Sequence, residues 1–194
     1  MEAIKEIEES KTRQQLFSKA DLKKLIVPLL FEQALAITVG MADTVMISSA
    51  GEAAVSGVSL IDMFNNLIIS VLAALATGGA VVTSQFLGAG KKEDACKSAK
   101  QLIVSSVCIT IGISILVMVF CNGIISLFFG KIEADVFHNA VIYMMISALS
   151  FPFLALYNSC AALFRSMGNS QITLKVSVVE NIINIGGNAL GVYV

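Results

Sequence analysis

Residues 102–121 read LIVSSVCITIGISILVMVFC, a run of twenty residues without one charged side chain. A helix of this length measures about 30 Å, which matches the hydrocarbon core of a bilayer. Because lipid offers no hydrogen-bond partner to the backbone, a span must be a helix or a strand of a closed barrel. This run is too long and too uniformly apolar for a barrel strand, so we predict a transmembrane helix.

Four further apolar segments accompany this run. Of the 194 residues, 56% are hydrophobic and only 14% are charged, whereas an average soluble domain carries about 25% charged residues. We therefore predict an all-α membrane protein, a polytopic bundle of transmembrane helices, with a cytoplasmic leader at residues 1–24 and a transmembrane region at residues 25–194. The predicted helices cover about residues 25–47, 55–86, 102–121, 136–161 and 172–194.

Basic residues set the predicted orientation, because Lys and Arg are retained on the cytoplasmic side of a membrane. With a cytoplasmic amino terminus, twelve of the thirteen Lys and Arg residues lie inside and only Lys131 lies outside. We therefore expect an integral protein of the plasma (inner) membrane with its amino terminus in the cytoplasm. The last predicted helix reaches Val194 without a charged or polar exit, which favours a fragment of a longer protein.

The composition disfavours several other classes of protein. The formal net charge is −1, whereas nucleic-acid binding needs a concentrated cationic face. The four cysteines are spaced too widely for a local zinc site. The sequence also contains no recognisable pairing of a nucleophile with a base. We expect neither an enzyme nor a bound cofactor, and no nucleic acid as a partner.

Acidic side chains within the predicted helices need a reason, because each costs about 2.5 to 3.5 kcal/mol to insert. Glu32 and Asp43 are eleven residues apart and share one face of the first helix at about 100° per residue. Glu32 either lines a substrate cavity or reaches the cytoplasmic interface. Asp43 lies deeper, with no basic residue in the interior of any predicted helix, so we expect it to take up a proton or hold a cation such as Na⁺.

The second helix carries a polar cluster. Asp62 and Asn66 are four residues apart with Asn65 between them, so the three side chains share one face. This cluster either lines the substrate cavity or forms hydrogen bonds between helices.

The fifth helix carries a polar stripe, in which Glu180, Asn184 and Asn188 follow one another at four-residue steps beside Asn181. Such a stripe cannot face lipid. Together with Asp43 it could supply oxygen ligands to a small hard cation. The alternative is a packing seam of Asn residues.

Three stretches of the chain resemble one family of transporters. Residues 40–47, GMADTVMI, follow Pro28 and resemble the first helix of the multidrug and toxic compound extrusion (MATE) transporters. Residues 84–90, SQFLGAG, resemble the exit from that family's second helix, and residues 164–170, FRSMGNS, its loop between helices four and five. The resemblance covers about residues 23–194.

The resemblance implies that the chain holds about five spans of a twelve-helix transporter with two lobes, and that a carboxy-terminal lobe remains outside it. It implies a secondary active exporter that moves lipophilic organic cations, such as cationic drugs, in exchange for H⁺ or Na⁺ by alternating access. Asp43 matches the family's acidic coupling residue, and Asn184 matches an Asn of the same site. Asn188 stands where some members have Asp, which leaves the coupling ion open.

Two alternative functions stay open at this point. A lipid-linked oligosaccharide flippase of the same superfamily would share these helices, but it should present cationic residues in its cavity, and none lies in the interior of the predicted helices. A membrane scaffold without transport activity would need neither Asp43 nor the polar stripe of the fifth helix.

The predicted orientation places the loop after the first helix outside the cell. In a Cys-free background, Ser49→Cys and Glu52→Cys should react with an impermeant thiol reagent applied from outside, because the distribution of basic residues leaves one favourable orientation. The measurement is labelling of intact cells against labelling of inverted membrane vesicles. Reaction from the cytoplasmic side alone would overturn the topology.

Overall fold

The structure is a computed structural model that describes residues 19–49 and 51–193, and of residues 188–193 it describes the backbone alone. The described part of the chain is helical apart from short connections, which confirms the all-α prediction. Its five helices are α2 (Lys19–Ser48), α3 (Glu52–Gly88), α4 (Lys92–Phe129), α5 (Ala134–Ser166) and α6 (Ser170–Tyr193).

The helices extend beyond most of the predicted boundaries. α4 begins at Lys92 rather than at residue 102, and its first turn contains acidic residues. Hydropathy marks only the part of a helix that suits hydrocarbon, whereas the backbone satisfies its own hydrogen bonds in lipid and in water alike. The predicted end at residue 121 falls at a break, because Phe120 leaves helical geometry at φ −104° and ψ 16°. α2 likewise begins at Lys19, so Pro28 lies inside this helix rather than in its first turn.

Four of the described helices, α2 to α5, are long and apolar enough to cross a membrane, whereas the fifth predicted span, α6, does not reach this hydropathy over its described residues. Lys175, Glu180 and the neighbouring Asn residues lower the hydropathy of α6. The polar stripe that suggested a function is thus the feature that weakens the sequence signal for a span.

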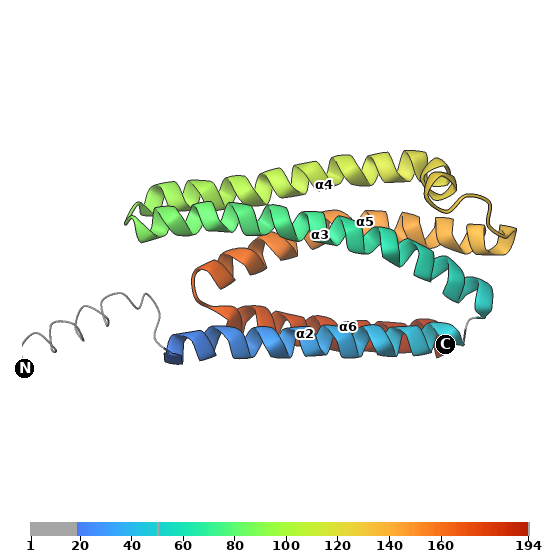
Figure 1. The fold of residues 1–194 in the computed structure, drawn as a ribbon, viewed down its shortest axis with the longest axis horizontal. Helices are drawn as coiled ribbons and strands as arrows, with labels where there is room; N and C mark the ends of the chain where they lie inside the picture. Colours follow the sequence, from blue (N-terminus) through green and yellow to red (C-terminus); the bar gives the residue numbers. More distant parts are fainter. Residues whose placement is uncertain (1–18, 50, 194) are drawn as a thin grey trace, which may run out of the picture.

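The helices form two groups (Figure 1). α3 packs against both α4 and α5, and α2 packs mainly against α6. α2 and α6 run side by side in the same direction, away from the α3–α4–α5 group along most of their length (Figure 1). The two groups make few contacts with each other. The space between them is therefore the candidate position of a binding site.

The core lies inside the α3–α4–α5 group. One buried cluster combines Ile61 of α3, Val117 and Ile125 of α4, and Met144 and Phe151 of α5. A second cluster, nearer the turn from α3 to α4, contains the small residues Ala76, Ala80 and Ala162 with Leu102 and Leu163. Small side chains allow helix backbones to approach closely, which is how helices associate where the surrounding lipid is as apolar as their side chains.

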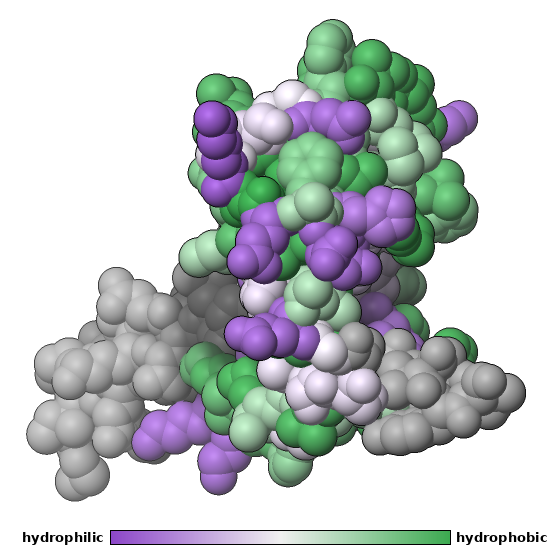
Figure 2. All heavy atoms as spheres, turned by 90° about the vertical axis from the view of Figure 1, so that its right-hand side faces the viewer, coloured by the Kyte–Doolittle hydropathy of each residue, from purple (hydrophilic) through white to green (hydrophobic). Residues whose placement is uncertain are grey.

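The outer surface is apolar, as a lipid-facing surface must be. Leu127 is 82% exposed and Phe153 is 71% exposed. Figure 2 views one end of the bundle and shows hydrophilic residues across the middle of this end, with hydrophobic residues along the sides.

The two ends of the bundle differ in charge. The start of α2, the α3–α4 turn and the α5–α6 turn lie at one end, on the left of Figure 1. Of the ten Lys and Arg residues that the structure describes, nine lie in or near these segments, and Lys131 lies at the other end. We call the first end the basic end. A cytoplasmic location of the basic end stays a prediction from the sequence.

Close packing of α3 against α5 depends on Gly57. A Cβ atom at this buried position would lie 3.0 Å from both the Ala140 nitrogen and the Val136 carbonyl oxygen, which are backbone atoms of α5. We predict that Gly57→Ala lowers the stability by about 1–3 kcal/mol, because overpacked helices must move apart. The measurement is thermal unfolding in detergent micelles.

The matched control is Gly78→Ala in the same helix, where a Cβ atom meets nothing within 4 Å. This variant should match or exceed the parent stability, because Ala favours a helix over Gly by about 0.8–1 kcal/mol. Equal stability for the two variants would contradict close packing at Gly57.

Candidate functional site

A cavity of about 570 Å³ lies between the two helix groups and is lined by residues of α2, α3, α5 and α6. A second cavity of about 400 Å³ adjoins it toward the link between α2 and α3. The residues that line both are Gly40, Asp43, Asp62, Tyr143 and Asn184. The polar residues that line only the larger cavity are Asn65, Asn66, Ser147, Ser150, Glu180 and Asn181.

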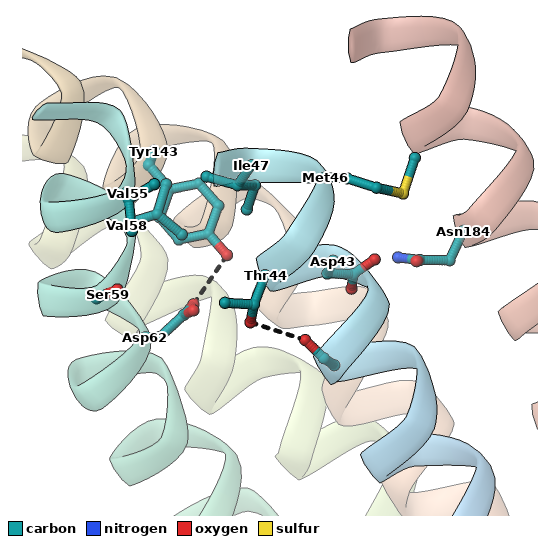
Figure 3. Close-up of a pocket in the computed structure, with 11 residues that line it drawn as sticks. Asp43, Thr44, Met46, Ile47, Val55, Val58, Ser59, Asp62, Tyr143 and Asn184 are labelled. Carbon is teal, nitrogen blue, oxygen red and sulfur yellow. Dashed lines mark hydrogen bonds between the residues drawn. The ribbon is translucent and has the colours of Figure 1, made fainter. Parts of the chain in front are cut away.

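Asp43 lies half-buried on α2 and faces the cavity. Figure 3 shows the side chains of Asp43 and Asn184 pointing toward each other from α2 and α6. The neighbouring Thr44 hydroxyl donates to the Gly40 carbonyl oxygen at 2.9 Å, within its own helix. Because the Thr44 hydroxyl is bonded within α2, Asp43 of α2 and Asn184 of α6 are the polar side chains that these two helices present where both cavities meet.

Asp62 lines the same cavities from α3 and has a defined partner. The Tyr143 hydroxyl of α5 donates to Asp62 Oδ1 at 2.9 Å (Figure 3). One turn away, Asn65 Nδ2 donates to the Ser147 hydroxyl at 3.1 Å. Asp62 and Asn65 thus combine the two roles that the sequence left as alternatives, because both line the cavity and bridge α3 to α5. Asn66 lines the cavity as well.

Tyr143 was not among the predicted site residues. The sequence does carry a signal for it, because Tyr143, Ser147 and Ser150 recur at helical spacing on α5 and define one polar face. Its hydroxyl gives Asp62 a hydrogen-bond donor from the neighbouring helix.

The polar stripe of α6 faces the cavity and α2. Glu180, Asn181 and Asn184 line the cavity together with Ala36, Val39 and Gly40 of α2. Glu180 also borders a third hollow, between α5 and α6, beside Tyr157. Asn188, the remaining predicted member of the stripe, lies outside the described side chains.

Glu32 lies elsewhere. It lines neither of the two cavities that contain Asp43. Instead, its Oε1 atom lies 3.6 Å from Arg165 Nη1. Arg165 belongs to the last turn of α5, which continues to Ser166 beyond the predicted end at residue 161, so a helix does place a basic residue beside one of the acidic ones. The local apolar pattern ends before Arg165, which is why the sequence placed this residue in a loop.

The donor set of the cavity suits a light cation better than a transition metal. The described residues contain no group of three or more His, Cys, Asp and Glu side chains that could hold a metal ion. Carboxylate and carboxamide oxygens are the ligands of hard cations. Asp43 with Asn184 is one pairing of this kind that lines the cavity.

The chain is similar in sequence to one family model and to curated proteins. Residues 28–190 match the MatE family model. The uncharacterised transporter YisQ of Bacillus subtilis (strain 168) is 30% identical over 191 residues, which are 93% of this chain and 42% of that protein. The probable multidrug resistance protein NorM of Thermotoga maritima is 25% identical over 172 residues, which are 86% of this chain and 36% of that protein.

Two solved structures share the fold. One is a MOP superfamily transporter from Pyrococcus furiosus Vc1, described as having a binding pocket of reverse polarity that suggests a different function. The other is an outward-facing conformation of a multidrug resistance MATE family transporter of that superfamily. Each structure has a TM-score of 0.80. The match covers 88% of this chain and 37% of the chain in the solved structure, and the sequence identities are 19% and 18%, respectively.

The chain spans about two fifths of the length of the curated relatives it matches, which agrees with the expectation that further helices remain outside it. The family model covers all five helices of the structure in whole or in part. This chain belongs to the MatE family of membrane transporters.

Proposed function

We propose that this chain forms part of a secondary active multidrug exporter that expels lipophilic organic cations in exchange for H⁺ or Na⁺. The observation that carries the proposal is Asp43 of α2, a half-buried carboxylate that lies beside the neutral carboxamide of Asn184 on α6, where both helices line the cavity between the two helix groups. The name of the Thermotoga maritima relative, a probable multidrug resistance protein, supports the same class of cargo.

Asp43 is the proposed coupling residue. A carboxylate within an apolar helix is costly, and protonation or cation binding removes most of that cost. Asn184 and Glu180 would add oxygen ligands for Na⁺, and Asn188 is assigned to the same set on the sequence alone. H⁺ coupling needs Asp43 alone, whereas Na⁺ coupling needs several of these oxygens.

The substrate cavity suits an apolar cation. Asp43, Asp62 and Glu180 give it negative charge, and Ile69, Phe151 and Leu154 give it apolar walls; Asn66 borders the same space. Among its described lining residues there is no Lys, Arg or His. A lipid-linked oligosaccharide would need cations to hold its pyrophosphate, so the lining favours the exporter over the flippase.

Alternating access follows from the two helix groups. An ion drives transport only if it binds one conformation more tightly than the other. Closing α2 and α6 onto α3 and α5 would bury Asp43, and this step is favourable only when its charge has been neutralised. A proton or Na⁺ at Asp43 therefore favours the closed arrangement, and its release favours the open one. The carboxy-terminal lobe of the complete protein would complete the translocation path.

The test is Asp43→Asn in the complete protein. This variant should insert and fold normally, because it keeps the size and the hydrogen-bonding capacity of the side chain while it removes a costly charge. Gradient-driven efflux should fall by about ten-fold or more, since an amide has no coupling charge to neutralise. The measurement is export of a fluorescent lipophilic cation from vesicles under an imposed H⁺ or Na⁺ gradient.

Asp62→Asn is the matched control, because it removes a carboxylate from the same cavity. We expect it to keep a larger share of the activity, since Asp62 is held by Tyr143 in a hydrogen bond between helices. Parental transport by Asp43→Asn under both gradients would remove Asp43 from the mechanism. The gradient that drives the parent protein identifies the coupling ion.

A further inference from the structure

The seam between α2, α5 and α6 changes character along its length. Around the cavity its side chains are half-buried or exposed, as at Asp43 and Asn184. Toward the basic end the seam is closed. There Glu32 is 7% exposed, Ser170 1%, and Thr173 2%. A layer of buried polar side chains thus lies between the cavity and the basic end.

Three polar contacts cross the closed part of the seam. The Ser170 hydroxyl of α6 donates to the Leu25 carbonyl oxygen of α2 at 3.2 Å. The hydroxyls of Tyr157 on α5 and Ser177 on α6 lie 2.9 Å apart.

The third contact, Glu32 with Arg165, joins α2 to α5. α2 and α5 otherwise make few contacts. The ion pair is therefore a direct tie between these two helices, beside the Tyr157–Ser177 contact that joins α5 to α6.

The tie is incomplete as an ion pair. It is a single contact of 3.6 Å rather than a bidentate one. Glu32 Oε2 is buried without a hydrogen-bond partner, and Arg165 Nε donates to the Ala161 carbonyl oxygen of its own helix at 3.2 Å. The contact thus gives Glu32 a counter-charge at Oε1 but leaves its Oε2 atom without a hydrogen-bond donor.

The two partners also differ in access to water. The Glu32 side chain is 9% exposed, whereas the Arg165 side chain is 31% exposed. Arg165 can exchange its partner for water, but Glu32 cannot do so while the seam stays closed. Breaking the pair in the closed seam would leave a buried carboxylate without a counter-charge, which is strongly unfavourable, so loss of the pair favours an open seam.

We propose that Glu32 and Arg165 are positioning residues that latch α2 against α5 and keep the cavity sealed from the basic end. Closing and opening the latch would set the side from which the cavity is reached; this transport role rests on the proposed function. The latch itself rests on the ion pair and on the burial around it.

The test is the reactivity of a cysteine at Thr173 in the complete, detergent-solubilised protein with its native cysteines replaced. The Thr173 hydroxyl donates to the Ser170 carbonyl oxygen of its own helix, so Thr173→Cys breaks no contact between helices. Arg165→Gln should raise the rate of labelling by a charged thiol reagent about ten-fold or more, because it leaves Glu32 buried and unpaired. Glu32→Gln should raise it less, because Arg165 reaches water.

Lys175→Gln is the control, since it removes an exposed basic residue from α6 at the same end and should leave the labelling rate unchanged. The double variant Glu32→Leu with Arg165→Met tests the latch by replacing the ion pair with an apolar contact. An apolar pair can replace a buried ion pair without loss of stability, so the seam should label as slowly as in the parent, while export slows several-fold because the seam no longer opens.

Unchanged labelling in both single variants would overturn the latch, whatever the outcome for Asp43. Parental labelling together with parental export in the double variant would also overturn it, because the pair would then be a packing contact only. Labelling needs neither substrate nor gradient, so failure of the latch and failure of the proposed coupling site are separate results.

Discussion

A carboxylate cannot face hydrocarbon without a partner, and this constraint arranges the whole lobe. Glu32, Asp43, Asp62 and Glu180 lie on three helices that otherwise consist mainly of apolar residues. Each of these helices must turn its acidic face inward, so the faces converge on the space between the helix groups. With the acidic faces directed inward, the large apolar side chains lie on the outside of the bundle, where they can contact lipid. The cavity is therefore a consequence of placing the charges as well as a feature required by transport.

The two helix groups differ in how they are held together, and this difference gives the lobe a place to move. α3, α4 and α5 interlock through apolar and small side chains, including the close approach at Gly57. α2 and α6 pair with each other but meet the first group through polar and water-accessible surface. Packed cores resist deformation, whereas a polar seam can exchange its contacts for water. Relative motion of the groups should thus occur along the seam that contains Asp43.

Local patterns in the sequence predicted the helices and the polar faces, but not which side chains meet. The apolar run at residues 102–121 was sufficient to identify α4, and the four-residue spacing of Glu180 and Asn184 correctly predicted an inward face. Glu32 and Arg165 lie far apart in the chain, and no periodicity links them. Tyr143 was overlooked for a related reason: its importance depends on Asp62, which belongs to another helix. Helical periodicity specifies the direction of a side chain, whereas its partner depends on the packing of the helices.

The partners of the acidic residues separate structural charges from the one that fits coupling. Glu32 faces a cation, Arg165, which balances its charge. Asp62 accepts a hydrogen bond from Tyr143 of the neighbouring helix. Asp43 faces the carboxamide of Asn184, and a carboxamide carries no net charge (Figure 3). If closing the seam excluded water from Asp43, binding of a proton or a small cation would lower the cost of burying this carboxylate. The coupling role is therefore proposed for Asp43, which lies beside a neutral carboxamide, rather than for Glu32 beside Arg165 or Asp62 beside Tyr143.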